Sequence, residues 1–168
     1  RHTRYPLVTG VQTCALPILS MKYISHRGNL LGPFPQLENR PDYILNALNS
    51  GFECECDVWY TGNSWWLGHD NPQYEIDYIF LFTPGLWIHA KNMEALERLK
   101  STNINYFWHE NDKYTITSHG YIWAYPGSRV SNKIICVMPE NADPPYSNEE
   151  KRSALGMCSD YVLVEKFK

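Results

Sequence analysis

The sequence lacks several features that would mark whole classes of protein. No apolar run reaches the roughly 18 residues that a membrane-spanning helix needs, so we expect no membrane span. Lys and Arg form no stripe and the formal net charge is −3, which argues against a nucleic-acid partner. Neither an internal repeat nor a low-complexity tract is present. The 168 residues, 43% of them hydrophobic, therefore predict one domain with a real core.

Cysteine motifs of metal or redox sites are also missing. The chain has five cysteines but no C-x-x-C pair, so there is no zinc-ribbon or thioredoxin signal. Cys54 and Cys56 would point the same way from one strand, which strains a disulfide between them. We expect buried free thiols in a reducing cytoplasm.

Acidic residues are absent from residues 1–20, which differ in texture from the rest. Within them, VTGVQTCALPIL resembles translated sequencing-adapter read-through. The alternative is a secretory signal, but Gly10, Gln12 and Pro17 make its apolar region poor. We interpret 1–20 as a non-native segment, disordered or loosely packed, and 21–168 as a single domain.

Short apolar segments alternate with helical patterns along 21–168. Asn39 can cap a helix that ends before Gly51, and Asn92 can cap another. Ser147 and Glu150 fit a capping box before a short helix. The expected strands are 21–28, 51–60, 65–67, 86–91, 104–112, 120–127, 133–140 and 159–167.

This alternation predicts an α/β fold with a parallel sheet whose faces are covered. Helices after the fourth, fifth and sixth strands are short or absent. A complete (β/α)₈ barrel usually needs about 250 residues. We therefore expect a TIM-like barrel that is reduced or incomplete, with short helices in its C-terminal half.

One strand carries an acid at every second position, in the stretch GFECECDVWY. Glu53, Glu55 and Asp57 share one face, because side chains at i and i+2 of a strand point the same way. An edge strand with one wet face would explain the pattern without a ligand. Acids that face a barrel interior must instead be neutralised or bind a cation. Two such carboxylates can share one divalent ion.

Histidines recur where the expected strands end. His26, His89 and His109 close the first, third and fourth strands, and His69 follows the second strand and its loop. Sites of α/β barrels lie at the C-terminal ends of the strands. Although a single histidine is usually a core or surface residue, this repeated placement favours a site.

These motifs, ISHRGN followed by LENRPDYILNALNSGFECECDVWYTGNSWWLGHD, resemble the glycerophosphodiester phosphodiesterase family, a TIM-barrel group. The family has H-R-G, then Glu-Asn before a helix, then G-x-x-x-x-E-x-D-V and His-Asp. All four elements occur here in order, and 21–168 looks like a compact branch. The second half of the chain resembles the family only in its general pattern and carries none of these specific motifs.

The resemblance implies roles for individual residues. His26 and His69 would be the general acid and base, with Arg27 and Lys91 holding the phosphate. Glu55, Asp57 and Glu38 would be metal ligands or lie close to the metal. The family has a Glu ligand where this chain has His89, so either His89 takes the ligand's place or Glu110 or Glu38 takes over that duty.

The resemblance implies one divalent cation, Ca²⁺ or Mg²⁺ by family analogy, with Mn²⁺ or Zn²⁺ open because His89 suits a softer ion. Most aromatic residues fit core packing. Trp108 and Tyr125, near strand ends, can stack on a substrate group, and His109 and Glu110 are further candidates for binding it.

The resemblance thus implies a metal-dependent hydrolase of a glycerophosphodiester or similar small phosphodiester, within lipid metabolism. A divalent ion, an Arg and a Lys neutralise phosphoryl charge, and two imidazoles divide the proton transfers. The alternatives are a non-catalytic phosphate- or sugar-binding module on the same barrel and a phosphoryl transferase.

Overall fold

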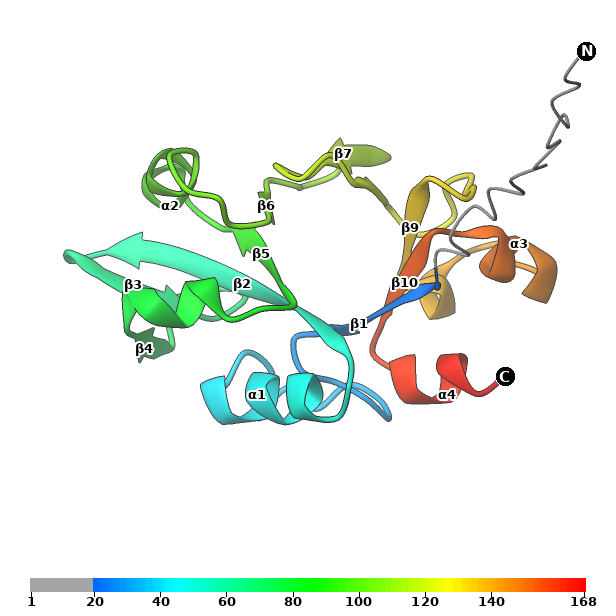
Figure 1. Ribbon diagram of the computed structural model, residues 1–168, viewed down its shortest axis with the longest axis horizontal. Coiled ribbons are helices and arrows are strands. Elements are labelled where there is room, and N and C mark those ends of the chain that lie inside the picture. Colours follow the sequence, from blue (N-terminus) through cyan, green and yellow to red (C-terminus); the bar gives the residue numbers. More distant parts are fainter. Residues whose placement is uncertain (1–19) are drawn as a thin grey trace, which may run out of the picture.

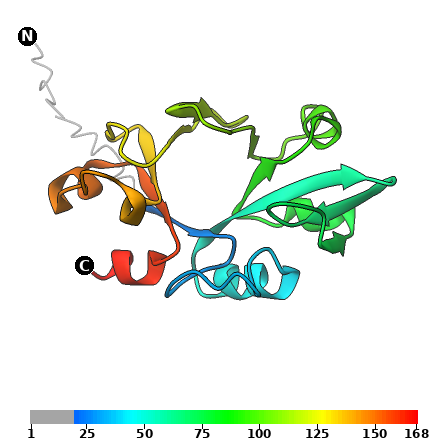
Figure 2. The ribbon, with the colours of Figure 1, turned by 180° about the vertical axis from the view of Figure 1, so that it is seen from behind.

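The computed structural model describes residues 20–168, so the expected non-native segment lies outside the described residues except for Ser20. The described chain is a mixed α/β fold in which one curled sheet forms an incomplete barrel and the helices lie outside it (Figure 1). Figure 2 shows the same ring of strands from behind.

Seven parallel-paired strands form the wall of the barrel, in the spatial order β6-β5-β2-β1-β10-β9-β8. They are β1 (Lys22–His26), β2 (Glu53–Thr61), β5 (Leu86–Ala90), β6 (Tyr106–Phe107), β8 (Ile122–Ala124), β9 (Ile134–Val137) and β10 (Gly156–Ser159). Three further strands add antiparallel: β3 (Ser64–Leu67) on β2, β4 (Tyr74–Ile76) on β3, and β7 (Tyr114–Ile116) on β8. The parallel wall confirms the predicted sheet type.

The barrel wall is weakest beside β6. Within residues 20–168, no strand ladder joins β6 to β7 or β8. The backbone N–H of Ser118 donates to the Tyr106 carbonyl at 2.8 Å, and the Tyr106 N–H donates to Ser118 Oγ at 3.0 Å. A few hydrogen bonds therefore replace a ladder here.

Residues 20–168 contain four α-helices and two 3₁₀ helices, of which the C-terminal α-helix follows the last strand. They are α1 (Pro41–Asn49), α2 (Met93–Leu99), α3 (Asn148–Ser153), α4 (Val162–Lys166), η1 (Tyr78–Phe82) and η2 (Pro139–Asn141). The predicted caps of α2 and α3 are confirmed: Asn92 accepts from the Ala95 N–H, and Ser147 with Glu150 forms the capping box. As predicted, the described chain has no α-helix between β6 and β9.

Two local predictions were wrong. The last strand is β10, at 156–159, whereas most of 159–167 forms α4. All four β10 residues are buried, and the strand pairs with β1 and β9. A short apolar run such as YVLV does not by itself distinguish helix from strand. Asn39 does not cap α1; Arg40 holds that position, and its side chain makes no capping bond.

Alternation along β2 separates two apolar clusters. Cys54, Cys56 and Val58 face outward, where they pack with residues of α1 and α2 such as Ile44 and Leu99. The second cluster fills the inside of the barrel and consists of Ile24, Trp87, Phe107, Trp123, Ile135, Val137 and Cys158. The acids of β2 lie on this inner side, so the interpretation of an edge strand with one wet face was wrong.

Glu53 lies at the N-terminal end of the barrel, away from the other two acids. Its carboxylate accepts from Lys22 Nζ at 2.7 Å and from Trp87 Nε1 at 2.6 Å. Lys22 also lies 5.5 Å from the centre of the Tyr121 ring. Glu53 is therefore neutralised by its neighbours and holds the base of the barrel together.

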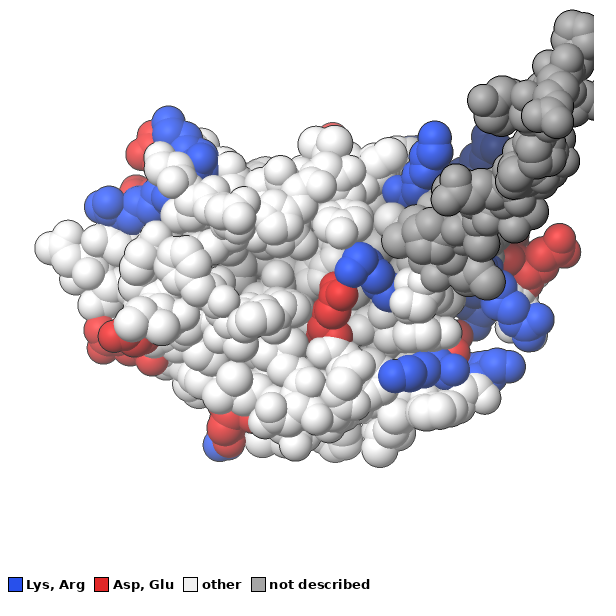
Figure 3. Space-filling model, viewed as in Figure 1, with Lys and Arg blue, Asp and Glu red and all other residues white. Residues whose placement is uncertain are grey.

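The outer surface carries mixed charge. On the face shown in Figure 3, the Lys and Arg residues drawn in colour lie mostly near Asp or Glu and form no continuous patch. None of the helices in residues 20–168 has the length and apolar character that crossing a bilayer requires.

We predict that the four cysteines of the described chain resist thiol reagents in the native state. Cys54, Cys56, Cys136 and Cys158 are buried and free, and burial raises their pKa values, to about 12 for Cys54 and Cys136. A Cys14→Ser variant of the full chain should show negligible reaction with Ellman's reagent until guanidinium releases all four thiols. Rapid reaction of any thiol in native buffer would contradict the packing described here.

Candidate functional site

Polar side chains gather at the C-terminal end of the barrel, where the parallel strands end. A cleft of about 660 Å³ opens there. The predicted site residues that line it are His26, Arg27, Glu55, His69, His89, Lys91, His109, Glu110 and Tyr125. Strand ends separated by up to 99 residues in sequence, such as His26 and Tyr125, therefore meet at one cleft.

Glu55, Asp57 and His89 form a compact cluster below this cleft. Each offers one ligand atom, and these atoms lie within 4.8 Å of one another. His89 Nδ1 is 3.1 Å from Asp57 Oδ1 and 3.7 Å from Glu55 Oε1. The register of β2 with β5 places them together, because Asp57 is paired with His89. Asp57 is fully buried and Glu55 nearly so.

The charges in this cluster perturb one another. Burial alone would raise the pKa of Asp57, but its bond with His89 and the charges of Arg27 and Lys91 lower that pKa far below its usual range. Burial alone would lower the pKa of His89, but the two carboxylates raise it to about 9. Asp57 therefore stays ionised at neutral pH.

The cluster can hold a metal ion. Glu55 Oε2 is a buried acceptor without a hydrogen-bond partner, and Asp57 Oδ1 has ion-pair contacts with His89 Nδ1 and Lys91 Nζ. A cation that displaces the His89 Nδ1 proton would satisfy both carboxylates. His89 Nε2 lies 2.9 Å from the His109 carbonyl, so it donates there and leaves Nδ1 facing the carboxylates. Histidines that bind metals are commonly anchored through their second nitrogen in this way. Two carboxylates and an imidazole are thus a suitable set of donors.

Asn39 supports Asp57 from behind. Asn39 Nδ2 donates to Asp57 Oδ2 at 2.9 Å, and Asn39 Oδ1 accepts from the Asp57 N–H at 2.9 Å. The Asn39 N–H donates to the Arg27 carbonyl. Both Asn39 and Arg27 have left-handed backbone conformations, with φ of 61° and 55°. Such strain in non-glycine residues is typical of functional sites.

Arg27 is held by two acids. Its Nε lies 2.9 Å from Asp57 Oδ2, and its Nη1 donates to Glu38 Oε2 at 3.2 Å. Glu38 also accepts from Asn29 Nδ2 at 2.9 Å. Glu38 therefore orients Arg27 and lies outside the cluster that can hold a metal, so the structure does not bring it together with Glu55 and Asp57 as a ligand.

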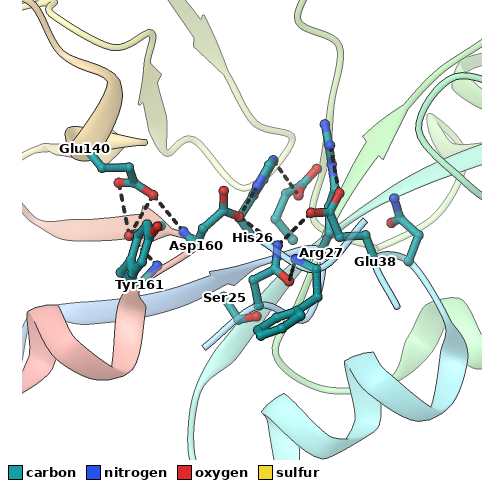
Figure 4. Close-up of polar contacts among 12 residues, drawn as sticks. Ser25, His26, Arg27, Glu38, Glu140, Asp160 and Tyr161 are labelled. Atoms are coloured by element: carbon teal, nitrogen blue, oxygen red, sulfur yellow. Dashed lines mark hydrogen bonds and ion pairs between the residues drawn. The ribbon is translucent and has the colours of Figure 1, made fainter. Parts of the chain in front are cut away.

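His26 is backed by a carboxylate that sequence reasoning missed (Figure 4). His26 Nδ1 donates to Asp160 Oδ1 at 2.7 Å, which leaves Nε2 directed inward, 3.9 Å from Glu55 Oε2. Burial lowers the pKa of His26, but the bond to Asp160 and the charge of Glu55 outweigh burial and raise it. Glu140 accepts from the Asp160 N–H at 2.9 Å and so fixes this residue. Figure 4 shows the resulting chain from Glu140 to His26.

His69 reaches the cleft on the loop between β3 and β4. Gly68 starts this loop with φ 148°, and a Cβ there would collide with the Asn71 carbonyl. The Gly68 carbonyl accepts from Trp59 Nε1 at 2.6 Å, which ties the loop to β2. His69 Nδ1 lies 2.7 Å from Asp70, and the His69 side chain is 42% exposed. The His69 side chain is therefore more accessible to solvent than that of His26.

Of the four residues expected to bind substrate, the structure brings three together at the cleft. His109, Glu110 and Tyr125 line the cleft, with the rings of His109 and Tyr125 5.7 Å apart. Trp108 packs instead against the outer apolar cluster. It follows Phe107, which faces the barrel interior, so the alternation of side chains turns Trp108 away from the cleft. The prediction that Trp108 stacks on a substrate group is therefore wrong.

Asp160 and Asn39 are the main residues that sequence reasoning missed. Asp160 directly follows β10, just as His26 stands at the end of β1. The expected strand 159–167 places Asp160 inside a strand, so a strand end at Ser159 is the signal that would identify it. The interpretation of Asn39 as a helix cap gives its side chain a different role from its contact with Asp57.

Comparison with known proteins identifies no relative. The chain matches no protein-family model, no curated protein and no solved structure. The chemical interpretation of the cleft therefore depends on its own residues.

We predict that Asn39→Ala destabilises the protein by about 3 kcal/mol. The change removes two hydrogen bonds to the buried Asp57 and places Ala in a left-handed conformation. The matched control is Asn63→Ala, since the exposed Asn63 has φ 64° but no such bonds, and it should cost only about 1 kcal/mol. Guanidinium unfolding curves measure both. Equal losses would show that the Asn39 side chain does not support Asp57.

Proposed function

We propose that the protein is a metal-dependent phosphodiesterase that hydrolyses a glycerophosphodiester or similar small phosphodiester to an alcohol and a phosphomonoester. The observation that carries this proposal is the shared cleft, which joins two histidines, two cationic side chains and the cluster that can hold a metal. The incomplete barrel would then be a reduced TIM-like barrel. The resemblance of its first-half motifs to the glycerophosphodiester phosphodiesterase family supports the same function.

The cationic side chains suit an anionic diester. Arg27 and Lys91 both line the cleft, and both form an ion pair with Asp57. Arg27 is fixed by Asp57 and Glu38, so part of its guanidinium can face phosphate oxygens without losing its orientation. Lys91 acts as a point charge. A divalent ion at the cluster would supply further neutralisation of phosphoryl charge.

The two histidines suit proton transfer. His26 donates through Nδ1 to Asp160, so its Nε2 is the atom that exchanges a proton with substrate. His69 lies on the loop between β3 and β4, and its side chain is partly exposed to solvent. One imidazole would take the proton of the attacking water while the other protonates the leaving alkoxide. Together these steps add water across one P–O bond.

An assay with glycerophosphodiesters and bis-aryl phosphates, with Ca²⁺, Mg²⁺, Mn²⁺ or Zn²⁺ and chelator controls, tests the proposal. We expect hydrolysis that a chelator abolishes. His26→Ala should lower turnover about 10²- to 10⁴-fold, and Asp57→Ala should lower it to background. Glu53→Gln is the matched control, because this acid of the same face lies at the other end of the barrel, and it should retain turnover.

Full turnover in the His26→Ala and Asp57→Ala variants would refute the site. Binding of diesters without turnover would favour the non-catalytic module, and transfer to an added alcohol in place of water would favour the transferase. Circular dichroism of each variant separates loss of function from loss of fold.

We also predict that Asp160 is a positioning residue for His26. Asp160→Asn replaces the carboxylate that accepts from His26 Nδ1 with a neutral amide, whose NH2 group can hold His26 in the other tautomer, and turnover should fall about 10²-fold or more. Metal affinity should stay unchanged, because Asp160 lies outside the cluster of Glu55, Asp57 and His89. Isothermal titration and steady-state kinetics on the same preparation measure the two effects. Parallel losses of affinity and turnover would contradict this role.

A further inference from the structure

We propose that the Glu55–Asp57–His89 cluster selects a late first-row divalent ion such as Zn²⁺ over Ca²⁺ and Mg²⁺, with His89 Nδ1 as the ligand that decides this preference. The inference deepens the proposed function and rests on its metal site. It differs from what the family resemblance implies, because the resemblance points to oxygen ligands and a hard ion.

The orientation of His89 makes its nitrogen a ligand. A carbonyl oxygen only accepts, so the 2.9 Å contact with the His109 carbonyl places a hydrogen on Nε2. Nδ1 is then the atom at 3.1 Å from Asp57 Oδ1 and 3.7 Å from Glu55 Oε1. Donors bound to one ion at zinc-like bond lengths and tetrahedral angles lie about 3.4 Å apart. The three donors are thus spaced to share one ion.

The ring of His89 is also fixed against rotation. It stacks on Phe107, with ring centres 4.9 Å apart and an angle of 12° between the planes. The side chain is only 16% exposed. Because the ring is held on one face and at Nε2, Nδ1 cannot turn away from the carboxylates without losing both contacts. Anchoring of this kind raises the affinity of a histidine for a metal.

Oxygen donors are few at this cluster. Asp57 Oδ2 is taken by Asn39 Nδ2 and lies beside Arg27, and Glu38 is held by Arg27 and Asn29. Ca²⁺ takes six to eight oxygen ligands and Mg²⁺ takes six, so either would depend largely on water here. Calcium sites gain affinity from carboxylate charge, but two cationic side chains offset this charge.

Arg27 and Lys91 supply that offset, since both lie within 4 Å of Asp57. A bound ion displaces the His89 Nδ1 proton, so the imidazole is neutral in the loaded site and the two carboxylates and the two cationic side chains balance. The electrostatic attraction that favours a hard ion is therefore weak. A bond from an imidazole nitrogen does not depend on net charge in the same way, and its strength increases toward the later first-row metals. Three protein donors with an open position are also the pattern of catalytic zinc sites.

The test is metal binding to the full chain carrying His2→Gln and Cys14→Ser, so that residues outside 20–168 add no imidazole or thiol donor. Competition with a fluorescent chelator at fixed pH should give a Kd for Zn²⁺ at least about 10³-fold below those for Ca²⁺ and Mg²⁺. In the same protein, bound Co²⁺ should show intense visible bands of a four- or five-coordinate site. Weak bands of a six-coordinate ion would overturn the proposal.

Since Zn²⁺ binds many sites more tightly than Ca²⁺, the decisive measurement is the effect of replacing His89. His89→Glu should weaken Zn²⁺ binding at least tenfold and narrow the ratio between Zn²⁺ and Ca²⁺. His119→Gln is the matched control, because His119 lies at the opposite end of the barrel, and it should leave both affinities unchanged. Undiminished Zn²⁺ affinity in His89→Glu would overturn the proposal.

The outcomes separate this inference from the proposed function. The cobalt spectrum is measured on the chain with His89 intact, so it decides the question even when His89→Glu fails to fold. Zinc-selective binding without any hydrolysis would refute only the phosphodiesterase. Hydrolysis with equal affinities for Ca²⁺ and Zn²⁺ would refute only the selectivity.

Discussion

The buried charge of Asp57 is the constraint around which this molecule is arranged. A carboxylate without solvent contact costs several kcal/mol unless neighbours compensate for it. Here Arg27, His89 and Lys91 surround it with positive charge, and Asn39 adds two hydrogen bonds. Three segments of the chain therefore converge on one side chain, and the cleft is built from the residues that stabilise it.

The same arrangement divides the barrel into two ends with different roles. At the N-terminal end, Glu53 is fully engaged by Lys22 and Trp87, so its charge supports stability. At the C-terminal end, Glu55 Oε2 and Asp57 Oδ1 keep free acceptor capacity. One strand thus carries structural and functional acids on one face. Barrels commonly show this division, with stability at the N-terminal end and chemistry at the C-terminal end.

Histidines in this cleft differ in how firmly they are held. His26 and His89 each use one ring nitrogen for an internal contact, to Asp160 and to the His109 carbonyl, and present the other to Glu55. His69 is on a loop and is partly exposed. The fixed imidazoles of His26 and His89 and the accessible imidazole of His69, three of the four that line the cleft, are compatible with separate roles in metal binding and proton transfer.

The sequence alone determined the mixed α/β class, the parallel sheet and the common face of Glu53, Glu55 and Asp57, because a period of two depends only on the local geometry of a strand. It also located most of the cleft residues, since they directly follow strand ends. Only the tertiary structure decided that Glu53 is neutralised, that Glu38 holds Arg27 and that Asp160 supports His26. Those assignments depend on the register between strands and on contacts across up to 134 positions of sequence, which no local pattern contains.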